Sequence, residues 1–374
     1  MGSRHADMLA EATDALAAGE PAILCTVVRL QGSGYGRPGA RLLLLGDGRR
    51  LGFVSGGCLE RELSQLAWPA TQDGPATLTF DTRGNPTQPG GRYNAGCDGC
   101  THILCERVSE AAIAPLRALV DAIDPILSGV VYDAGDSGLP VGLRRTGDDP
   151  GELAAAFGVA ASGALGGHYS LELTDPPAAG ASVFVERLQS PPAVVLFGAG
   201  DDVVPVASLA AAAGRRVAVV ASQPDRLAAD RWPAVVRIES PAATAVQTLD
   251  RQGWLAPRTA CVLMTHSFDD DLTLLPGLLA SPANYVGMLG PKRRMGRLMT
   301  RLHERGRLPA ESQLEKLRSP VGLDLGATTP EEIALAIVAE IVAAGHGRTG
   351  GSLARRDGAI HEPHRHLTAD PVLT

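Results

Sequence analysis

The most reactive side chains of this sequence gather in residues 96–105, which hold Cys97, Cys100, His102 and Cys105. A structural zinc site uses four such ligands, usually as two close pairs, and only one CxxC pair occurs here. If residues 101–106 form a strand, His102 and Cys105 point to opposite faces, which counts against shared coordination. Zinc through these four residues is therefore kept as an alternative. Cys100 and Cys105 are expected to be small packing residues.

Two thiols differ from the others because each directly follows a glycine in an expected loop. These are Cys97, after Gly96, and Cys58, after Gly57. Such a thiol can be exposed, and a ligand can come close to it. Cys97 is therefore the first candidate for contacting a metal or a sulfur-bearing ligand, and Cys58 is the second.

The second half offers a nucleotide-binding pattern. The apolar run 193–197 leads directly into Gly198-Ala-Gly200 and then into an apolar helix at 203–213. A strand that ends in glycines lets a pyrophosphate approach the backbone and meet the amides of the helix amino end. Val203 replaces the third glycine of the usual motif, and Asp201 and Asp202 oppose phosphate binding unless they point away.

The next strand lacks the acid that normally receives a ribose hydroxyl, because Ala221-Ser222 stands at its end. Ser222 with Arg226 can instead accept a 2'-phosphate, or these two can be surface residues without a role. A Rossmann scaffold that holds no dinucleotide is an equal alternative for this region.

Further polar candidates follow later strands of the same half. His266 comes after a buried strand, at the sheet edge where crevice ligands bind, so it is a candidate proton carrier or ligand contact, or it simply bonds its own loop. Gly290 precedes Lys292, Arg293 and Arg294 at a helix start. That cluster either clamps phosphates or forms a solvated basic helix face.

Periodicity and turn residues predict the elements that position these side chains. In the first hundred residues we expect a helix over 8–16, a hairpin signal at Gly46-Asp47-Gly48 and a long loop over 81–99. The remaining expected elements there are a helix near 58–66 and strands at 22–28, 41–45, 76–80 and 101–106.

In the second half, four apolar runs alternate with helical segments, as βαβ units of a parallel sheet require. They lie at 193–197, 217–221, 259–264 and 284–286. A last helix is expected over 330–344, where Thr329 caps, Pro330 opens the helix and Glu332 completes a capping box.

The expected fold class is α/β, with a small mixed α+β N-terminal domain followed by a Rossmann-like parallel-sheet domain. We place the first domain at 1–108 and the second at 191–346. Between them lies a middle segment, 109–190, with a helix and a strand near 126–132 but no chemistry that we can name. The polar tail, 347–374, is expected to be irregular.

Composition excludes several classes of protein. A chain of 374 residues with 45% hydrophobic residues can build two cores, and its net charge of -7 argues against binding nucleic acid. We find no signal peptide, no segment that would span a membrane, and no P-loop, GxSxG or HExxH motif. A cytoplasmic protein with reduced thiols is expected.

Taken in order, the motifs of both halves closely resemble those of the XdhC/CoxI family. In the first half they are Gly32-Ser33, Arg37-Pro-Gly-Ala-Arg41, Gly52-Phe-Val-Ser-Gly-Gly-Cys-Leu-Glu60 and Gly96-Cys97-Asp98-Gly99. In the second half they are Phe197-Gly-Ala-Gly200, Thr265-His266, Tyr285-Val-Gly-Met-Leu-Gly290 with Lys292-Arg293-Arg294, and Gly322-Leu-Asp-Leu-Gly326 ahead of Thr329-Pro-Glu-Glu-Ile333. The similarity covers most of 10–108 and 192–345. This sequence has Asp201 and Asp202 where the family often has His and an apolar residue, and Asp98 where glycine is common.

The resemblance implies a chaperone that binds molybdenum cofactor, protects it, supports its sulfuration with a cysteine desulfurase and inserts it into a molybdenum hydroxylase of the xanthine or CO dehydrogenase type. It implies a homodimer without turnover of its own. Cys97 would touch molybdenum through the cofactor. The glycines at 56, 57, 96 and 99 would admit the pterin and phosphate, as would Gly198, Gly200, Gly290, His266, Lys292 and Arg293 in the second half.

Three further side chains have two interpretations each. Glu60 either orients pterin nitrogens or, as an exposed residue at a helix start, stabilises the helix dipole. Arg37 and Arg41 either pair with phosphate or are solvated. Two other functions stay open for the whole chain: an NAD(P)-dependent oxidoreductase that uses the Rossmann half, with His266 as its proton-transfer group, and a zinc-stabilised interaction protein.

Overall fold

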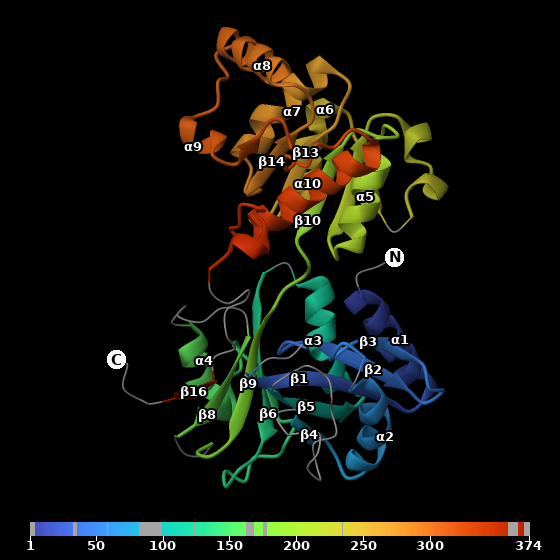
Figure 1. Ribbon diagram of the computed structural model, residues 1–374, viewed down its shortest axis with the longest axis vertical. Helices are drawn as coiled ribbons and strands as arrows, with labels where there is room; N and C mark the ends of the chain where they lie inside the picture. Colours follow the sequence, from blue (N-terminus) through green and yellow to red (C-terminus); the bar gives the residue numbers. More distant parts are fainter. Residues whose placement is uncertain are drawn as a thin grey trace. The chain divides into compact units, whose positions relative to one another are not determined.

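The computed structural model describes residues 4–32, 36–57, 59–81, 99–122, 124–161, 168–174, 178–233, 235–357 and 366–369. The described chain forms two compact units (Figure 1). The N-terminal unit contains residues 4–190 and the short strand His366–Ala369, and the C-terminal unit contains residues 191–357. Each unit has its own sheets and its own core.

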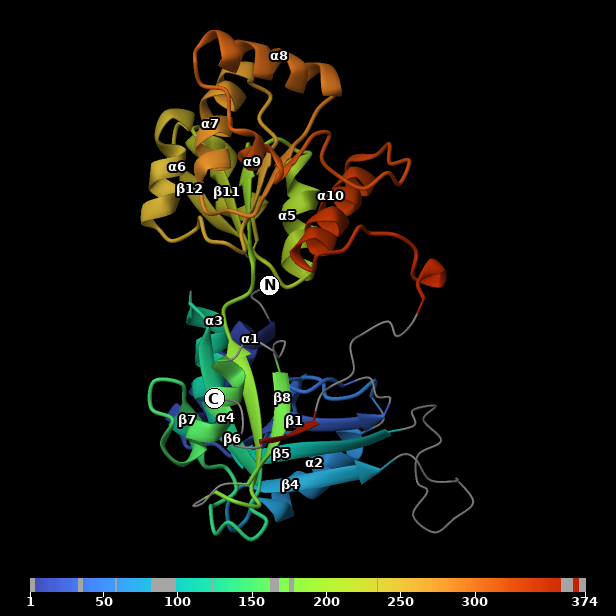
Figure 2. The same cartoon turned by 90° about the vertical axis from the view of Figure 1, so that its left-hand side faces the viewer.

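The first sheet of the N-terminal unit is antiparallel, with the order β3-β2-β1-β5-β4. Its strands are β1 (Ala22–Gly32), β2 (Arg41–Leu45), β3 (Arg50–Gly52), β4 (Ala76–Asp81) and β5 (Gly99–Arg107). Helix α2 (Glu60–Ala70) lies against one face of this sheet (Figure 2). Because side chains alternate along a strand, Ile23 and Cys25 of β1 both point to that face and pack against α2. Leu24 faces the opposite side, against α1 (Arg4–Ala18) and α3 (Glu110–Asp121).

The middle segment of the chain builds a second sheet in the same unit, with the order β16-β8-β9-β6-β7. Its strands are β6 (Ile126–Asp133), β7 (Arg144–Thr146), β8 (His168–Leu173), β9 (Ser182–Leu188) and β16 (His366–Ala369). One face packs on Val28 and Leu104 of the first sheet, and α4 (Ala154–Ala161) covers the other. Segment 109–190 is therefore part of the N-terminal unit's core.

The expectation of an irregular tail is wrong at β16, which pairs with β8 in parallel register, His366 opposite Ser170. Four residues of mixed polarity carry no periodic signal, so this strand exists because β8 offers an unpaired backbone edge. Strands β8 and β9 were also not predicted from the sequence.

The C-terminal unit is built on a six-stranded parallel sheet with the order β12-β11-β10-β13-β14-β15. Its strands are β10 (Ala193–Phe197), β11 (Arg216–Ala221), β12 (Val236–Glu239), β13 (Ala260–Leu263), β14 (Tyr285–Met288) and β15 (Leu317–Arg318). Numbered along the chain this is the 3-2-1-4-5-6 order of the Rossmann fold, which reverses between β10 and β13. The expected fold class is confirmed.

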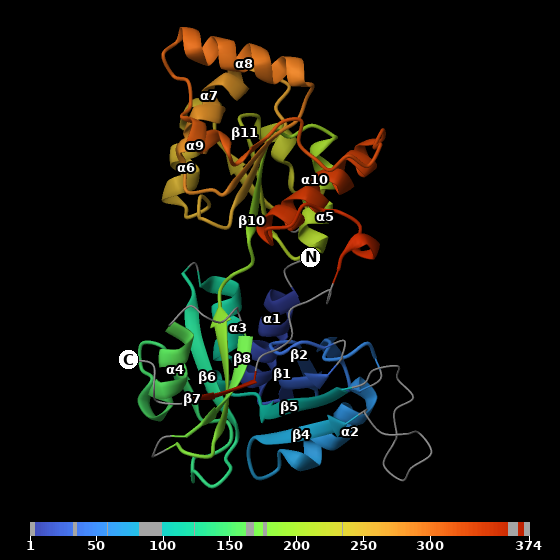
Figure 3. The ribbon, with the colours of Figure 1, turned by 60° about the vertical axis from the view of Figure 1, so that its left-hand side comes forward.

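Helices cover both faces of this sheet, as Figure 3 shows. Helices α5 (Val203–Ala212) and α10 (Pro330–Gly345) pack on one face. Helices α6 (Ala242–Arg251), α7 (Phe268–Ala280) and α8 (Lys292–Glu304) pack on the other, and α9 (Glu311–Leu314) is a single turn. The capping box predicted for α10 is confirmed: Thr329 accepts from the Glu332 amide, and Glu332 accepts from the Thr329 amide.

None of the helices in the described ranges combines the length and the apolar character that a membrane crossing needs.

Candidate functional site

A cavity of about 270 Å³ opens at the carboxyl edge of the parallel sheet, where β10, β11 and β13 end. This is the point at which the strand order reverses, and crevices of doubly wound sheets bind their ligands there. The lining that matters chemically is Gly198, Gly200, Ser222, Arg226, His266 and Asp270. The structure thus brings the predicted residues Gly198, Gly200 and His266 into one crevice, together with Ser222 and Arg226.

The two glycines are required by close approaches inside the crevice. Gly198 has φ +118°, and a Cβ added there would lie 2.5 Å from the carbonyl oxygen of Met264. A Cβ on Gly200 would lie 2.3 Å from Asp202 Oδ1 and 3.0 Å from His266 Nε2. Absence of side chains at both positions lets β10 and β13 end side by side and leaves their backbone open to a ligand.

The two aspartates that were expected to oppose an anion do not line the cavity. Asp201 is fully exposed, and its Oδ1 forms an ion pair with Arg231 Nη2 at 2.6 Å. Asp202 Oδ1 lies 3.5 Å from Nε2 of His266, whose side chain is 77% exposed. Asp201 is thus neutralised outside the crevice, whereas Asp202 places a carboxylate beside the histidine at its rim.

The end of β11 supplies the crevice with polar groups and no acid. Ser222, Gln223 and Arg226 line it, and Arg226 lies in a short 3-10 helix, Pro224–Leu227. An arginine and a hydroxyl at this position suit a phosphate better than a ribose diol. The observed position agrees with the interpretation that Ser222 and Arg226 can accept a phosphate.

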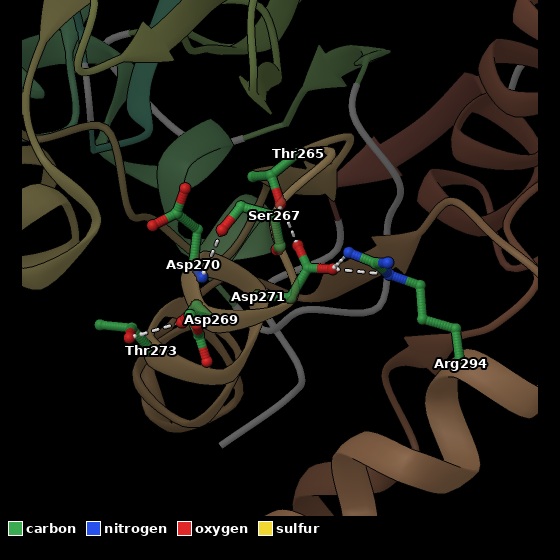
Figure 4. A network of polar contacts seen from close by, with 7 residues as sticks. All are labelled: Thr265, Ser267, Asp269, Asp270, Asp271, Thr273 and Arg294. Carbon is green, nitrogen blue, oxygen red and sulfur yellow. Dashed lines mark hydrogen bonds and ion pairs between the residues drawn. The ribbon is translucent and has the colours of Figure 1, made fainter.

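Asp271, a residue that sequence reasoning missed, holds the His266 loop in place (Figure 4). Its buried carboxylate accepts a hydrogen bond from the Thr265 hydroxyl at 2.5 Å and from Arg294 Nη2 at 2.7 Å. Burial raises the pKa of Asp271 above its ordinary value, against the hydrogen bonds from Thr265 and Arg294, which lower it. Asp271 is one of three consecutive aspartates in the first turn of α7, so the sequence carries no signal that singles it out.

The basic cluster at the start of α8 divides into two roles. Arg294 is tied to Asp271, while Lys292 and Arg293 are exposed and do not line the crevice. Gly290, with φ +126°, makes the turn from β14 into this helix. Lys292 and Arg293 therefore stand at the same edge of the sheet as the crevice but outside it.

In the N-terminal unit, the predicted residues Cys58, Gly96 and Cys97 lie outside the described residues. Gly56 and Gly57 are exposed, and Gly57 adopts φ +109°. Gly99 is buried as the first residue of β5, opposite Gly32. The exposed pair at 56 and 57 keeps the backbone of this loop accessible.

Glu60 is buried, so the expectation of an exposed helix-start glutamate is wrong. Its Oε1 accepts from the amides of Val54 at 3.1 Å and Ser55 at 2.7 Å, and its Oε2 accepts from the Ser55 hydroxyl. Burial acts to raise the pKa of Glu60, but these hydrogen bonds outweigh it and lower the pKa. The carboxylate thus fixes the loop that carries Gly56 and Gly57.

Of the two arginines in this half that could pair with phosphate, Arg41 has a structural role. Arg41 is buried on β2 and forms an ion pair with the buried Glu186 of β9. Arg37 is exposed. Arg41 is therefore neither solvated nor open to a ligand.

Cys100 and Cys105 are buried on opposite faces of β5, as strand alternation predicted for His102 and Cys105. Cys100 Sγ lies 3.7 Å from His102 Nε2, while Cys105 packs in the core beneath α2 beside Cys25. In the described ranges no three His, Cys, Asp or Glu side chains are grouped as metal ligands. The described thiols thus behave as packing residues, and burial raises the pKa of Cys261 to about 12.

Two family models match the chain in order: the XdhC and CoxI family at residues 15–81 and the XdhC Rossmann domain at residues 194–341. A protein of Bacillus subtilis (strain 168) that is named as a probable xanthine dehydrogenase subunit is 29% identical over 327 residues, which cover 86% of this chain and 93% of that protein. The chain is 25% identical over 338 residues to the molybdenum cofactor insertion chaperone PaoD of Escherichia coli (strain K12), covering 90% and 87% of the two chains.

Among solved structures, a Bacillus halodurans protein described as a xanthine dehydrogenase superposes with a TM-score of 0.66 at 23% identity. The superposition covers 93% of this chain and 98% of that one, so the two share a fold over nearly their whole lengths.

Proposed function

The chain belongs to the XdhC and CoxI family, and on this premise we propose that it is a maturation factor for molybdenum enzymes. It binds molybdenum cofactor, protects it, and inserts it into a molybdenum hydroxylase of the xanthine or CO dehydrogenase type. The relative PaoD, named as a molybdenum cofactor insertion chaperone, supports this proposal because the similarity extends over 90% of the chain.

The observation that carries the proposal is the crevice at the strand-order reversal, with two glycines in its wall. A flat, phosphorylated pterin needs a site where the backbone can come close and where phosphate meets donors. Gly198 and Gly200 provide the close approach, and Arg226 and Ser222 provide the donors. At about 270 Å³ the crevice is slightly smaller than the roughly 300 Å³ at which ligand pockets usually begin. It would hold one part of the cofactor and leave the rest accessible for transfer.

Lys292 and Arg293 are proposed as secondary phosphate contacts at the same sheet edge, since their side chains are exposed at the start of α8. In the N-terminal unit, Gly56, Gly57, Gly96 and Gly99 are proposed to admit the pterin. Cys97, and secondly Cys58, are proposed to contact molybdenum. A cysteine desulfurase is the partner that would supply sulfur to the bound cofactor.

Glu60 has a different role in this proposal from the two that the sequence suggested, which were contact with pterin nitrogens and stabilisation of the helix dipole. Both carboxylate oxygens are engaged by Val54 and Ser55, so we assign it to positioning the glycine loop rather than to holding pterin nitrogens.

The decisive experiment is purification of the full chain from a host that makes the cofactor. Molybdenum and zinc are measured by mass spectrometry, and pterin by fluorescence after oxidation. We expect molybdenum and pterin in equal amounts, and activation of a cofactor-free hydroxylase on mixing. Stoichiometric zinc without pterin would reject the proposal in favour of a zinc-stabilised interaction protein.

The second candidate function, a nicotinamide-dependent oxidoreductase, is favoured by the position of Ser222 and Arg226 in the crevice. These groups suit the 2'-phosphate of NADP(H), and His266 lies at the same rim. Calorimetric titration with NADPH and NADH tests it. NADPH binding that is lost in Arg226→Gln, from protein without pterin, would support the oxidoreductase and count against the chaperone.

A further inference from the structure

A second cavity, of about 260 Å³, lies at the opposite edge of the Rossmann sheet. Its wall includes Ala260 and Tyr285, the first residues of β13 and β14, and Arg215, which directly precedes β11. Since the strands are parallel, this amino edge is separated from the first crevice by the length of the strands. The two cavities are therefore distinct sites within one unit.

Positive charge dominates this second cavity. Arg215, Arg258 and His346 line it together with Asn284 and Tyr285, and none of the described lining residues is acidic. Burial lowers the pKa of Arg215, and the nearby charge of Arg258 lowers it further, while burial lowers the pKa of Arg258 as well. An anion in the cavity would stabilise the half-buried Arg215 guanidinium, which feels the charge of the nearby, more exposed Arg258.

Two helix ends lie near Arg215, and backbone amides satisfy carbonyls at both of them. Helix α5 ends with backbone bonds from Gly214 to Ala211 and from Arg215 to Ala210, at 2.9 and 3.0 Å. Helix α10 ends in the same way, with bonds from Gly347 to Ala344 and from Arg348 to Ala343. The carbonyls of Ala210, Ala211, Ala343 and Ala344 are thus satisfied by backbone amides and not by the Arg215 guanidinium.

The remaining wall leaves room for that guanidinium. A Cβ built on Gly345 would lie 3.8 Å from both Nη1 and Nη2 of Arg215, an ordinary contact distance, so the guanidinium lies beside the end of α10. The acid near the wall, Glu340, is engaged elsewhere: it accepts from the Tyr285 hydroxyl at 2.5 Å and from the Gly322 amide at 2.8 Å. The Tyr285 hydroxyl is thus directed to Glu340, and Tyr285 and Ile341 line the cavity beside the arginines.

We propose that this cavity is a second ligand site, which binds the phosphate group of a small molecule between Arg215 and Arg258. The planar guanidinium forks match phosphate oxygens in pairs, and Asn284 and His346 add donors at the rim. The site is independent of cofactor binding at the carboxyl edge. Its position at the amino ends of the strands, away from the crevice, suits a regulatory ligand rather than the cargo.

The test uses the full chain without cofactor and inorganic phosphate as the probe. Binding is measured by titration calorimetry at constant ionic strength, with acetate as a singly charged comparison. The variants are Arg215→Gln and Arg258→Gln, with Arg251→Gln, an exposed residue at the end of α6, as the matched control. Arg226→Gln and Lys292→Gln report on phosphate that binds at the carboxyl edge instead, in the crevice or at the α8 start.

We expect a saturable phosphate site that is weakened about tenfold or more by each of the first two variants and left unchanged by Arg251→Gln. Arg215→Lys, which keeps the charge but not the fork, should bind at an intermediate strength. The proposal is overturned if phosphate shows no saturable heat, if acetate binds equally well, or if Arg226→Gln or Lys292→Gln alone removes binding. Circular dichroism checks that each variant folds. If Arg215→Gln does not fold, phosphate binding by Arg258→Gln, a substitution at an exposed position, tests the proposal on its own.

Discussion

Arg294 donates two hydrogen bonds, from Nε at 3.0 Å and from Nη2 at 2.7 Å, to one oxygen of the buried Asp271 carboxylate. The other oxygen of Asp271 accepts from Thr265, the residue before His266. Through this one carboxylate the start of α8 is linked to the loop that brings His266 to the crevice. Of the three residues in this network, only Thr265 lines the crevice, while Asp271 and Arg294 hold its loop from behind.

Replacing Arg294 with Gln should lower the free energy of unfolding by about 1–3 kcal/mol, because a buried carboxylate loses its charged donor. Arg301→Gln, on the same helix, breaks only an exposed pair with Glu304 and should cost less than about 1 kcal/mol. Urea unfolding of both variants measures the difference. Equal stabilities would show that the Asp271 pair contributes no more than a surface contact.

The Arg294→Gln penalty should also depend on pH. The pKa of Asp271 is already raised in the folded protein, so stability falls as pH rises from about 4 through the folded pKa. Loss of Arg294 raises the pKa of Asp271 further, so the stability of the variant continues to fall to a higher pH. The difference in the free energy of unfolding between Arg294→Gln and wild type should thus increase from about pH 4 to about pH 7. A difference that decreases over this range would show that the lost interaction with ionised Asp271 is not the cause.

Glu60→Gln should destabilise the N-terminal unit by about 1–3 kcal/mol at neutral pH, because the loop donors Val54 and Ser55 lose their charged acceptor. The pKa of Glu60 is lowered on folding, so its contribution is present above about pH 4.3 and is lost as pH falls through the folded pKa. Unfolding from pH 7 to pH 3 should show the variant converging on wild type. Glu20→Gln, at an exposed position, is the control and should show no such convergence.

Gly200→Ala should reduce the molybdenum content of purified protein while the fold persists. The added methyl would displace the side chains of Asp202 and His266 into the crevice mouth, and both are flexible enough to move. Gly296→Ala, on α8 with open space around it, is the matched control and should retain molybdenum with equal or higher stability. If both variants carried as much molybdenum as wild type, the crevice would not be the cofactor site.

Cys97→Ala should lose molybdenum retention without loss of stability, since the sequence predicts this thiol in a loop, where it would contribute little to a core. Cys261→Ala is the opposite case: the residue is fully buried on β13, so the variant should lose stability through a small cavity and keep its molybdenum. Metal analysis and thermal melting of the two variants separate the roles. Unchanged molybdenum in Cys97→Ala would remove that thiol from the proposed site.

The sequence alone predicted the elements whose signals are local. The strand at 193–197, the helix that follows its glycines and the capping box at Thr329 each depend on neighbours within a few residues, and all three elements are confirmed. The same locality explains why His266 was placed correctly: a residue just after a parallel strand must lie at the carboxyl edge.

Only the tertiary structure decided which charged side chains are buried and with what. Arg41 and Glu186 are far apart in sequence, as are Arg294 and Asp271, and no spacing rule links either pair. The strand β16 likewise depends on an edge that another part of the chain provides. Partners of this kind are selected by packing and desolvation in the folded chain, whereas helix periods, caps and glycine turns are set by interactions between near neighbours.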